Sequence, residues 1–376
     1  MWIYENQNWP SFSWDSKRLS SLLTDIRYRQ GLLFGRMEAL GFDLKNDTRL
    51  NTLTLDVVKS SKIEGENLDQ NEVRSSIARK LGIESAGLIS SSRDVDGVVE
   101  MILDATQYYS QPLTKKRLLK WHRSLFPSGR SGKHCIVVGD WRSIENDPMQ
   151  VVSGHIGKET VHFEAPSAAI IESEIFQFLS WFNTETQIDP VLKAGIAHLW
   201  FITIHPFEDG NGRIARAIAD MLLARAEHSK GRFYSLSAQI ELDRKEYYLE
   251  LERQQRNSTD ITFWLEWFLN CLSSAISTAE SNVNLILYKA MLWNRINAEP
   301  VHDRQKLIIN KMLDSSFKGH INTSKYAKIV KCSNDTALRD IQSLKERNIL
   351  IQNPGGGRST SYRLVTLEEF KRDVDI

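Results

Sequence analysis

The segment His205–Arg216 reads HPFEDGNGRIAR and lies between two long apolar stretches, VLKAGIAHLWFITI and IARAIADMLLARAEH. The residue before a proline is pushed out of helical geometry, so a first helix is expected to end at His205. Glycines 210 and 212 let the next turn of backbone approach a ligand, and the amides at the start of the second helix point toward it. The segment therefore predicts two helices joined by a phosphate-binding loop.

Side chains of the same segment add to this predicted phosphate site. Arg213 and Arg216 are three residues apart in the first turn of the second helix, so both guanidinium groups can reach the same phosphates. Asp209 supplies a hard oxygen for Mg²⁺, which takes only one or two protein carboxylates beside substrate phosphates and water. His205 is the group best suited to accept a proton near neutral pH.

A metal centre and a P-loop are the alternatives to this phosphate-binding site. His198, His205 and Asp209 form a rival metal site, because positions 198 and 205 are seven apart and share a helix face. A P-loop is excluded, since the sequence contains no G-x-x-x-x-G-K-[ST].

Composition indicates a folded protein of several domains. The 376 residues are 41% hydrophobic and include 10 Trp, 15 Phe and 10 Tyr, which excludes a disordered or collagenous chain and predicts two to four domains. Cys135, Cys271 and Cys332 are far apart, which excludes a disulfide framework and a cysteine zinc site. We expect a cytoplasmic protein with no membrane segment, because neither a signal peptide nor a spanning stretch is recognisable.

Changes of pattern along the chain predict four regions. Residues 1–100 are expected to form an N-terminal helical domain of three helices, the last of them ended by Gly82. Residues 101–280 form a second, mostly helical domain that carries the segment described above, and residues 281–300 form a helical linker. Within the second region, MQVVSGHIGKETVHFEAP (149–166) has β-branched runs on both sides of a glycine-containing turn, which predicts a hairpin lying over another part of the fold.

Residues 301–376 are expected to form a winged helix-turn-helix domain, with three helices followed by strand, turn and strand. Ser333 is a suitable N-cap for the third helix, and Ala337, Leu338, Ile341 and Leu344 are expected to form its buried stripe. This region has 14 Lys and Arg against 9 Asp and Glu, although the whole chain carries a net charge of only +1. A DNA-binding regulator that acts through residues 301–376 is therefore an alternative to an enzyme.

HPFEDGNGRIAR resembles the signature of the Fic family, H-P-F-x-[DE]-G-N-[GK]-R-x-x-R, at every specified position. The resemblance implies a mainly α fold, in which a Fic helical core with a β-hairpin flap transfers AMP from ATP to a hydroxyl of a target protein. It implies that His205 is the catalytic base, that Asp209 holds Mg²⁺ and that Phe207 packs in the core. The implied phosphate- and ATP-binding residues are Glu208, Asp209, Gly210, Asn211, Gly212, Arg213 and Arg216. Relatives that act as kinases have lysine at the position of Gly212, so glycine favours nucleotidyl transfer.

Two further segments resemble parts of the same family. The hairpin is similar in placement to the flap that pairs with the target protein and covers the nucleotide, which places Val152, Ser153, Gly154 and His155 near the ligand. KEYYLELERQQ resembles the stretch that packs on the adenine, with Tyr247, Tyr248 and Gln255 as the candidates. Ordinary helix packing is the alternative explanation for the two tyrosines.

Residues Ser60 to Gly65, SSKIEG, resemble the family's autoinhibitory motif, [ST]-x-x-x-E-[GN]. Ser60 and Glu64 are one helical turn apart and face the same way. The resemblance implies that Glu64 pairs with Arg216 and withdraws it from the γ-phosphate of ATP. The alternative is a solvated glutamate on a helix surface.

The resemblance also implies the partners of the protein. They are ATP, a target protein bound along the flap, the chain itself as a target of self-modification, and a second copy in a homodimer. Transfer of UMP, of a phosphate or of another phosphodiester-borne group on the same scaffold stays open, because the loop recognises phosphates and not the base.

Overall fold

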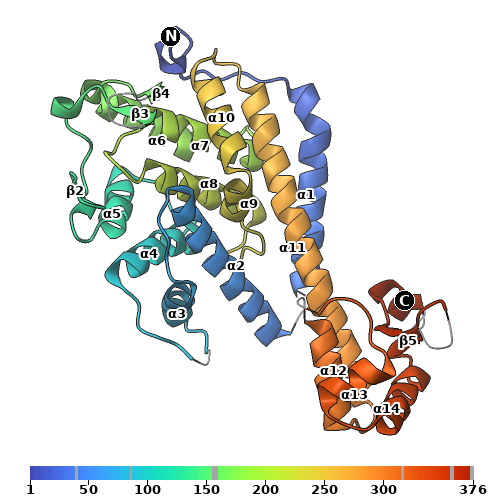
Figure 1. Ribbon diagram of the computed structural model, residues 1–376. Coiled ribbons are helices and arrows are strands. Elements are labelled where there is room, and N and C mark those ends of the chain that lie inside the picture. Colours follow the sequence, from blue (N-terminus) through green and yellow to red (C-terminus); the bar gives the residue numbers. More distant parts are fainter. Residues whose placement is uncertain (39–40, 85–86, 155–159, 315–316, 356–359, 373–376) are drawn as a thin grey trace. The chain divides into compact units, whose positions relative to one another are not determined.

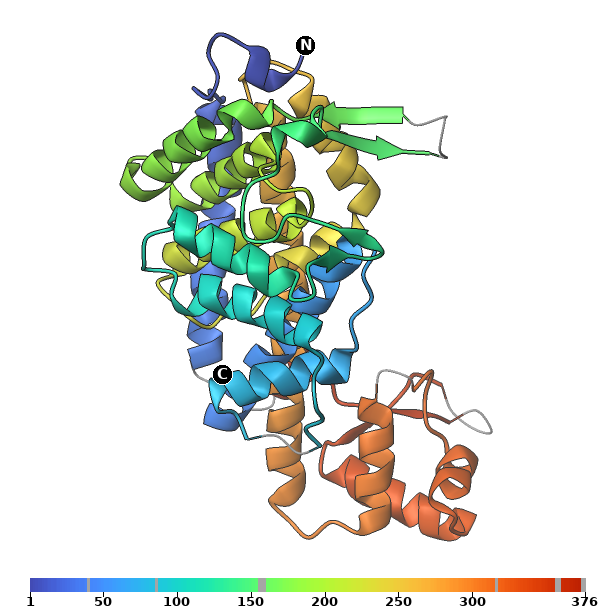
Figure 2. The same ribbon diagram turned by 90° about the vertical axis from the view of Figure 1, so that its left-hand side faces the viewer.

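The computed structural model describes residues 1–376 except 39–40, 85–86, 155–159, 315–316, 356–359 and 373–376. Its contacts divide the chain into two compact units, residues 1–280 and 281–376. The described strands form three separate two-stranded antiparallel pairs, and helices make up most of the rest (Figures 1 and 2). None of the described helices is both long enough and apolar enough to cross a membrane.

Helices α7 (Pro190–Ile204) and α8 (Asn211–Glu227) pack along each other in the middle of the first unit (Figures 1 and 2). Every residue of α7 from Val191 to Ile204 is buried, because neighbouring elements cover all its sides, and most of these residues are apolar. It begins at an Asp189 N-cap followed by Pro190, a combination that favours a helix start. It ends at His205, as the following proline predicts.

The N-terminal helices are α1 (Ser16–Glu38), α2 (Phe42–Ile63) and α3 (Gln70–Leu81). Gly82 ends α3 in the left-handed conformation, with φ 65° and ψ 30°, as predicted. Helix α2 begins eight residues before the apolar pattern at Leu50 suggested, and its last turn carries Ser60 close to α8. Arg29 of α1 binds Ser273 and Glu280 of α11 (Thr262–Asn297) at 3.0 and 2.7 Å, which holds these two helices side by side.

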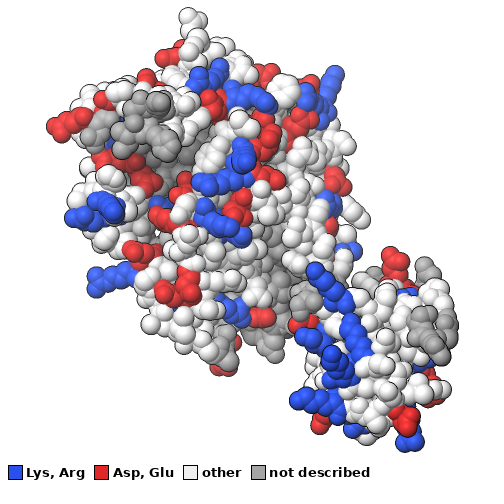
Figure 3. Space-filling view, viewed as in Figure 1, with Lys and Arg blue, Asp and Glu red and all other residues white. Residues whose placement is uncertain are grey.

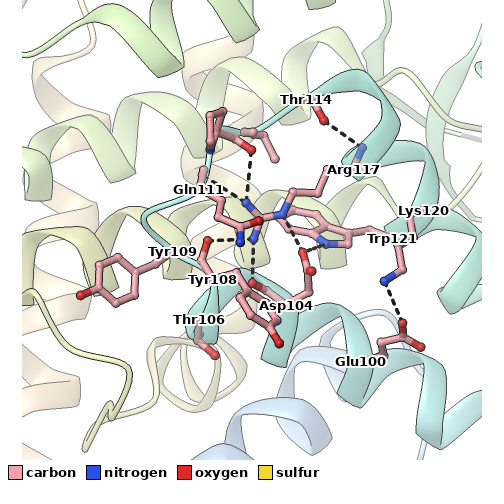
Figure 4. A network of polar contacts seen from close by, with 12 residues as sticks. Glu100, Asp104, Thr106, Tyr108, Tyr109, Gln111, Thr114, Arg117, Lys120 and Trp121 are labelled. Carbon is pink, nitrogen blue, oxygen red and sulfur yellow. Dashed lines mark hydrogen bonds and ion pairs between the residues drawn. The ribbon is translucent and has the colours of Figure 1, made fainter.

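Helices α4 (Arg93–Gln107) and α5 (Lys115–Leu125) form an antiparallel pair that is joined by a polar network (Figure 4). Arg117 donates to the Asp104 carboxylate at 2.6 Å and to the carbonyl oxygens of Asp104, Tyr108 and Gln111 at 2.7 to 3.2 Å. Trp121 Nε1 donates to the same carboxylate at 2.6 Å. The network binds the C-terminal end of α4 to α5. Helix α5 also carries His122, which contacts the loop of residues 205–210 between α7 and α8, called the motif loop below.

The remaining elements of the first unit surround this core. They are the short 3-10 helices η1 (Ile3–Glu5), η2 (Ile144–Asn146) and η3 (Ala168–Ile170), the strand pair β1 (Arg130–Ser131) and β2 (His134–Cys135), and the helices α6 (Ile171–Thr184), α9 (Leu236–Leu242) and α10 (Arg244–Gln255). The β1–β2 pair was not predicted, because two-residue strands leave no periodic signal in a sequence.

The predicted hairpin is present as β3 (Gln150–Ser153) and β4 (Thr160–Glu164). Gln150 pairs with Glu164 and Ser153 with Thr160, with a bulge between Val151 and Val152. Phe163 of β4 is buried under Trp2, at a ring-centroid distance of 5.3 Å, so the N-terminal residues anchor the base of the hairpin. His155 lies outside the described residues.

The second unit contains the end of α11 and the elements α12 (Asp303–Leu313), α13 (Thr323–Val330), α14 (Asn334–Glu346), β5 (Leu350–Gln352), β6 (Tyr362–Leu364) and α15 (Leu367–Arg372). Of residues 281–300, predicted as a helical linker, 281–297 belong to α11, and Leu292 and Ile296 are buried in the core of this unit. The boundaries proposed at residues 100 and 300 stay predictions, as does the winged-helix assignment.

Ser333 caps α14 by accepting from the backbone amide of Thr336, as expected. The buried stripe of α14 is corrected at one position. Ala337, Ile341 and Leu344 are buried, whereas Leu338 is 47% exposed. Asp340 takes the fourth buried place because it accepts from Tyr326 Oη and Arg304 Nε, both at 3.1 Å, so a paired polar side chain lies where the apolar pattern predicted none.

Candidate active site

A cavity of about 740 Å³ opens between the hairpin, the 205–212 loop and α10. Its lining includes His205, Glu208 and Asp209 from the loop, Asn211 and Gly212 from the start of α8, Val152 and Ser153 from β3, Tyr247, Tyr248 and Gln255 from α10, and Glu64 from the end of α2. Four segments that are far apart in the sequence thus meet at one site.

His205 ends α7 in the left-handed conformation, with φ 50° and ψ 57°. Its ring Nδ1 donates to the Ile202 carbonyl at 3.2 Å, which leaves Nε2 as the nitrogen with a free lone pair. Burial lowers the pKa of His205 to about 4, and the nearby Arg142 acts in the same direction. The imidazole is therefore neutral at pH 7 and ready to accept a proton.

Contacts inside the loop hold it in one shape. Asn211 receives a hydrogen bond from the Phe207 amide at 3.0 Å and donates to the Phe207 carbonyl at 2.8 Å, which closes the loop on itself. Phe207 is fully buried, as expected, and stacks on His122 at a centroid distance of 4.1 Å. Gly210 has φ 83°, and a Cβ there would lie 3.0 Å from the Phe126 ring, so glycine suits both the backbone and the space.

Asp209 points one carboxylate oxygen at the amide of Gly210, 2.5 Å away, and the other accepts from the Ser131 hydroxyl. Glu208 accepts from the Val137 amide at 2.9 Å. Both carboxylates are only partly buried and line the cavity.

The rival metal site finds no support. His198 is buried, its Nε2 is 2.9 Å from Tyr247 Oη, and burial lowers its pKa to about 3. Within the part of the chain that the structure describes, no group of three or more His, Cys, Asp or Glu side chains is arranged to hold a metal ion.

Arg213 and Arg216 are buried, and each is paired with a carboxylate from the segment after α2. Glu64 Oε1 is 2.8 Å from Arg216 Nη2, and Glu66 Oε2 is 2.6 Å from Arg213 Nη1. Ser60 accepts from Arg216 through its hydroxyl at 2.9 Å and its carbonyl at 2.8 Å. Burial opposes the charge of Arg216, but Glu64 and the neighbouring tyrosines together raise its pKa above the ordinary value.

Glu64 also lies directly on the first turn of α8. A Cβ built on Gly212 would be 2.1 Å from Glu64 Oε1, so this carboxylate fills the space beside the first turn of α8. Gly65, with φ 87°, makes the turn that follows α2. Tyr248 donates to the Ile63 carbonyl at 3.3 Å, which fastens the same turn to α10.

The residues predicted to lie near the adenine ring and the nucleotide differ in their exposure. Tyr247 and Gln255 are buried at the cavity wall, whereas Tyr248 is 38% exposed. Gln255 donates to the Thr203 hydroxyl at 3.4 Å. Gly154, with φ 109°, follows Ser153 at the end of β3 and is exposed.

Sequence reasoning missed Arg142, which fastens the motif loop to the base of the hairpin. Its side chain is fully buried, and it donates to the His205 carbonyl at 2.9 Å, to Asp147 at 2.6 Å and to the Pro166 carbonyl. No local pattern marks such a residue, because two of its three partners, the His205 and Pro166 carbonyls, lie 63 and 24 residues away along the chain.

His122 was missed as well, although it supports the same loop. It accepts from the Gly139 amide at 3.0 Å and donates to the Asp209 carbonyl at 3.2 Å. Burial lowers its pKa to about 4, which keeps the ring neutral in this role. Its stacking on Phe207 explains why an aromatic side chain precedes the acidic pair.

Comparison with known proteins agrees with this geometry. Residues 112–223 match the family model described as the Fic/DOC family, and residues 2–83 match a domain of unknown function, DUF4172. The segment that matches the Fic/DOC family model contains α7, the 205–210 loop, the hairpin and most of α8.

Curated relatives of the chain are named protein adenylyltransferases. Fic-1 of Caenorhabditis elegans is 26% identical over 178 residues, which are 46% of this chain and 32% of the relative. The Fic protein of Nematostella vectensis is 23% identical over 224 residues, 58% of this chain and 47% of the relative. The chain thus spans between about a third and about half of the length of these two relatives.

A solved Fic family protein from Desulfovibrio desulfuricans G20 has the same fold. The comparison of the two structures gives a TM-score of 0.50 at 19% sequence identity and covers 92% of this chain and 96% of that chain.

Proposed function

We propose that this protein is an adenylyltransferase that transfers AMP from ATP to a hydroxyl side chain of a protein. The main support is the cavity, in which a neutral histidine with a free Nε2, a carboxylate and the start of α8 lie beneath a β-hairpin. The names of the curated relatives agree with this activity.

In the proposed reaction, the acceptor oxygen forms a bond to the α-phosphorus and the bond from that phosphorus to the bridging oxygen breaks. Pyrophosphate leaves, and the hydroxyl proton passes to Nε2 of His205. The amides of Gly212 and Arg213 at the start of α8 bind the phosphate oxygens, since the positive end of the helix dipole lies there. Asn211 acts by holding the loop in shape, because both of its amide contacts are to Phe207.

The residues present fit Mg²⁺. Asp209 is a partly buried carboxylate at the cavity wall, beside the loop proposed to hold phosphates, and a single protein carboxylate suffices when phosphates and water complete the shell. When bound, the ion supplies charge neutralisation at the phosphates. Ser131, whose hydroxyl donates to Asp209, keeps this carboxylate oriented.

We propose that Glu64 inhibits the enzyme. Its carboxylate occupies the space over Gly212 and pairs with Arg216, the arginine expected to bind the γ-phosphate. ATP then meets a negative charge where a phosphate should lie, and the guanidinium that would attract it is already neutralised.

The proposed base-binding residues are Tyr247, Tyr248 and Gln255, with Val152, Ser153 and Gly154 covering the nucleotide from the hairpin. Tyr248 is the one exposed enough to stack on a ring, because Tyr247 is buried against His198. These contacts recognise a flat ring and leave UMP transfer as the competing reaction.

The test is incubation of the full chain in cell lysate with Mg²⁺ and each nucleoside triphosphate labelled at the α-phosphate. Label from ATP in protein, absent with His205→Ala, is the expected result. General-base removal should lower the rate by about 10²-fold or more, while ATP binding measured by calorimetry stays within about threefold. Equal labelling by His205→Ala would refute the assigned role, and label from UTP in place of ATP would change the nucleotide.

A second proposed function belongs to the second unit, which we propose is a winged helix that binds DNA. The exposed side chains Arg339, Gln342 and Lys345 on α14 support this proposal. Figure 3 shows one face of this unit, and on that face Lys and Arg side chains gather along one side. A gel shift at two salt concentrations tests it, since binding through phosphates weakens steeply with salt. No shift at about 50 mM salt would refute DNA contact.

The cytoplasmic location and the homodimer are proposals as well. Three cysteines that are all free agree with a reducing compartment. Analytical ultracentrifugation of the full chain tests the homodimer, and a single species of monomer mass at micromolar concentration would refute it.

A further inference from the structure

Ser153, His162 and Glu252 form a continuous series of hydrogen bonds at the cavity wall. Glu252 Oε2 is 2.8 Å from His162 Nδ1, and His162 Nε2 is 2.6 Å from Ser153 Oγ. The three side chains come from α10, β4 and β3, and all three line the cavity that contains His205 and Asp209. We propose that Ser153 is a site of self-modification, an AMP acceptor whose hydroxyl is activated by His162 and Glu252.

The acid at one end of the series determines which ring nitrogen carries the proton. A carboxylate can only accept, so Nδ1 of His162 must be the donor to Glu252. In the neutral ring Nε2 is then the acceptor, and the Ser153 hydroxyl donates to it. This order of carboxylate, imidazole and hydroxyl is the one that turns a serine into a nucleophile.

Arg256 holds the acid in place. Its Nε is 3.3 Å from Glu252 Oε1, and its Nη2 donates to the Val161 carbonyl at 2.7 Å. The same arginine therefore binds both the carboxylate and the strand that carries His162. In activated nucleophiles the general base is commonly oriented by a third group, and here Glu252 has that position behind His162.

Thr160 provides an internal comparison. It pairs with Ser153 across the hairpin and is also exposed, but among the residues that the structure describes no histidine is hydrogen-bonded to its hydroxyl. A hairpin that needed only two exposed hydroxyls at its end would not require the partly buried Glu252 carboxylate and Arg256 behind one of them.

The chemistry follows from the proposed function and rests on it. Ser153 Oγ forms a bond to the α-phosphorus of ATP, the bond to the bridging oxygen breaks, and pyrophosphate leaves. The hydroxyl proton moves to His162 Nε2, and Glu252 stabilises the resulting imidazolium. The product carries an AMP ester on the hairpin that is proposed to receive the target protein, so self-modification would oppose target binding.

The experiment uses the full chain with Glu64→Gly, incubated with Mg²⁺ and α-labelled ATP, and locates the label by tandem mass spectrometry of proteolytic peptides. AMP on Ser153 is expected, and Ser153→Ala should remove it from that peptide. Thr160→Ala is the matched control and should keep the label on Ser153.

A His162→Gln variant distinguishes activation from a mere bracing of the hairpin. The ratio of Ser153 label to label in an added protein acceptor should fall about 10²-fold if His162 is the base. An unchanged ratio would overturn the activation, and label on other residues with none on Ser153 would overturn the site while leaving the adenylyltransferase intact. If no protein at all is labelled, the proposed function fails and the site with it.

Discussion

Replacing Glu64 by glycine removes the carboxylate that lies between the motif loop and Arg216. In the wild type its Oε1 is 2.8 Å from Arg216 Nη2 and fills the space beside Gly212. After the change, Arg216 keeps its two hydrogen bonds to Ser60. The N–H group that faced Glu64 can then donate to a phosphate oxygen in the cavity. AMP transfer, including self-modification, should therefore increase.

The size of the increase follows from the interaction that becomes available. A hydrogen bond to a charged group contributes about 1.5–3 kcal/mol. At about 1.4 kcal/mol for each factor of ten, restoring one such contact to the γ-phosphate should raise the rate about 10- to 100-fold. Initial rates of label transfer from α-labelled ATP, at saturating ATP and Mg²⁺, measure it.

Three further variants separate the causes. Glu64→Gln keeps the side-chain volume over Gly212 and removes the negative charge. If volume and charge each hinder phosphate binding, its rate should lie between those of the wild type and Glu64→Gly. Arg216→Ala combined with Glu64→Gly should abolish the gain, whereas independent effects would multiply. Glu84, an exposed carboxylate of the same N-terminal region, is the matched control, and Glu84→Gly should leave the rate unchanged. A Glu64→Gly rate at or below that of the wild type would refute the inhibitory role.

Three other predictions concern the metal, the loop and a buried acid. Asp209→Ala should abolish the dependence of transfer on Mg²⁺ concentration, and a titration identical to wild type would exclude Asp209 as the ligand. Arg142→Met should lower the free energy of unfolding by about 3–5 kcal/mol in urea denaturation, because it leaves Asp147 and the His205 carbonyl without their buried partner; a loss below about 1 kcal/mol would contradict this. Burial raises the pKa of Glu227 to about 7 against an ordinary 4.5, so the folded state binds the extra proton between these values and loses stability as pH rises through 7. Glu227→Gln should therefore be increasingly more stable than wild type from pH 5 to pH 8, by about 1–3 kcal/mol at the upper end, and a pH-independent difference would rule out this titration.

The sequence alone predicted the local features of the site. Pro206 ends α7, the two glycines allow the loop, and the apolar spacing of α7 and α8 requires that both be buried. These outcomes depend on backbone geometry and on neighbours within a few positions, which are visible in a single chain. The hairpin was predictable for the same reason, and so were the Gly82 and Ser333 caps.

Other features depended on the three-dimensional packing of distant segments. Leu338 was expected to be buried and is exposed, because Asp340 found two polar partners that the apolar pattern could not reveal. Arg142 connects the His205 carbonyl with Asp147 and Pro166, and Glu252 reaches His162 from ninety residues away. A helix or a turn is determined by its own residues, whereas a long polar side chain on a surface becomes a partner only when folding brings another segment within 3 Å of it. The residue types of the motif were therefore fixed by the sequence, and their tautomers, their pairing and the cavity between them were decided by the tertiary structure.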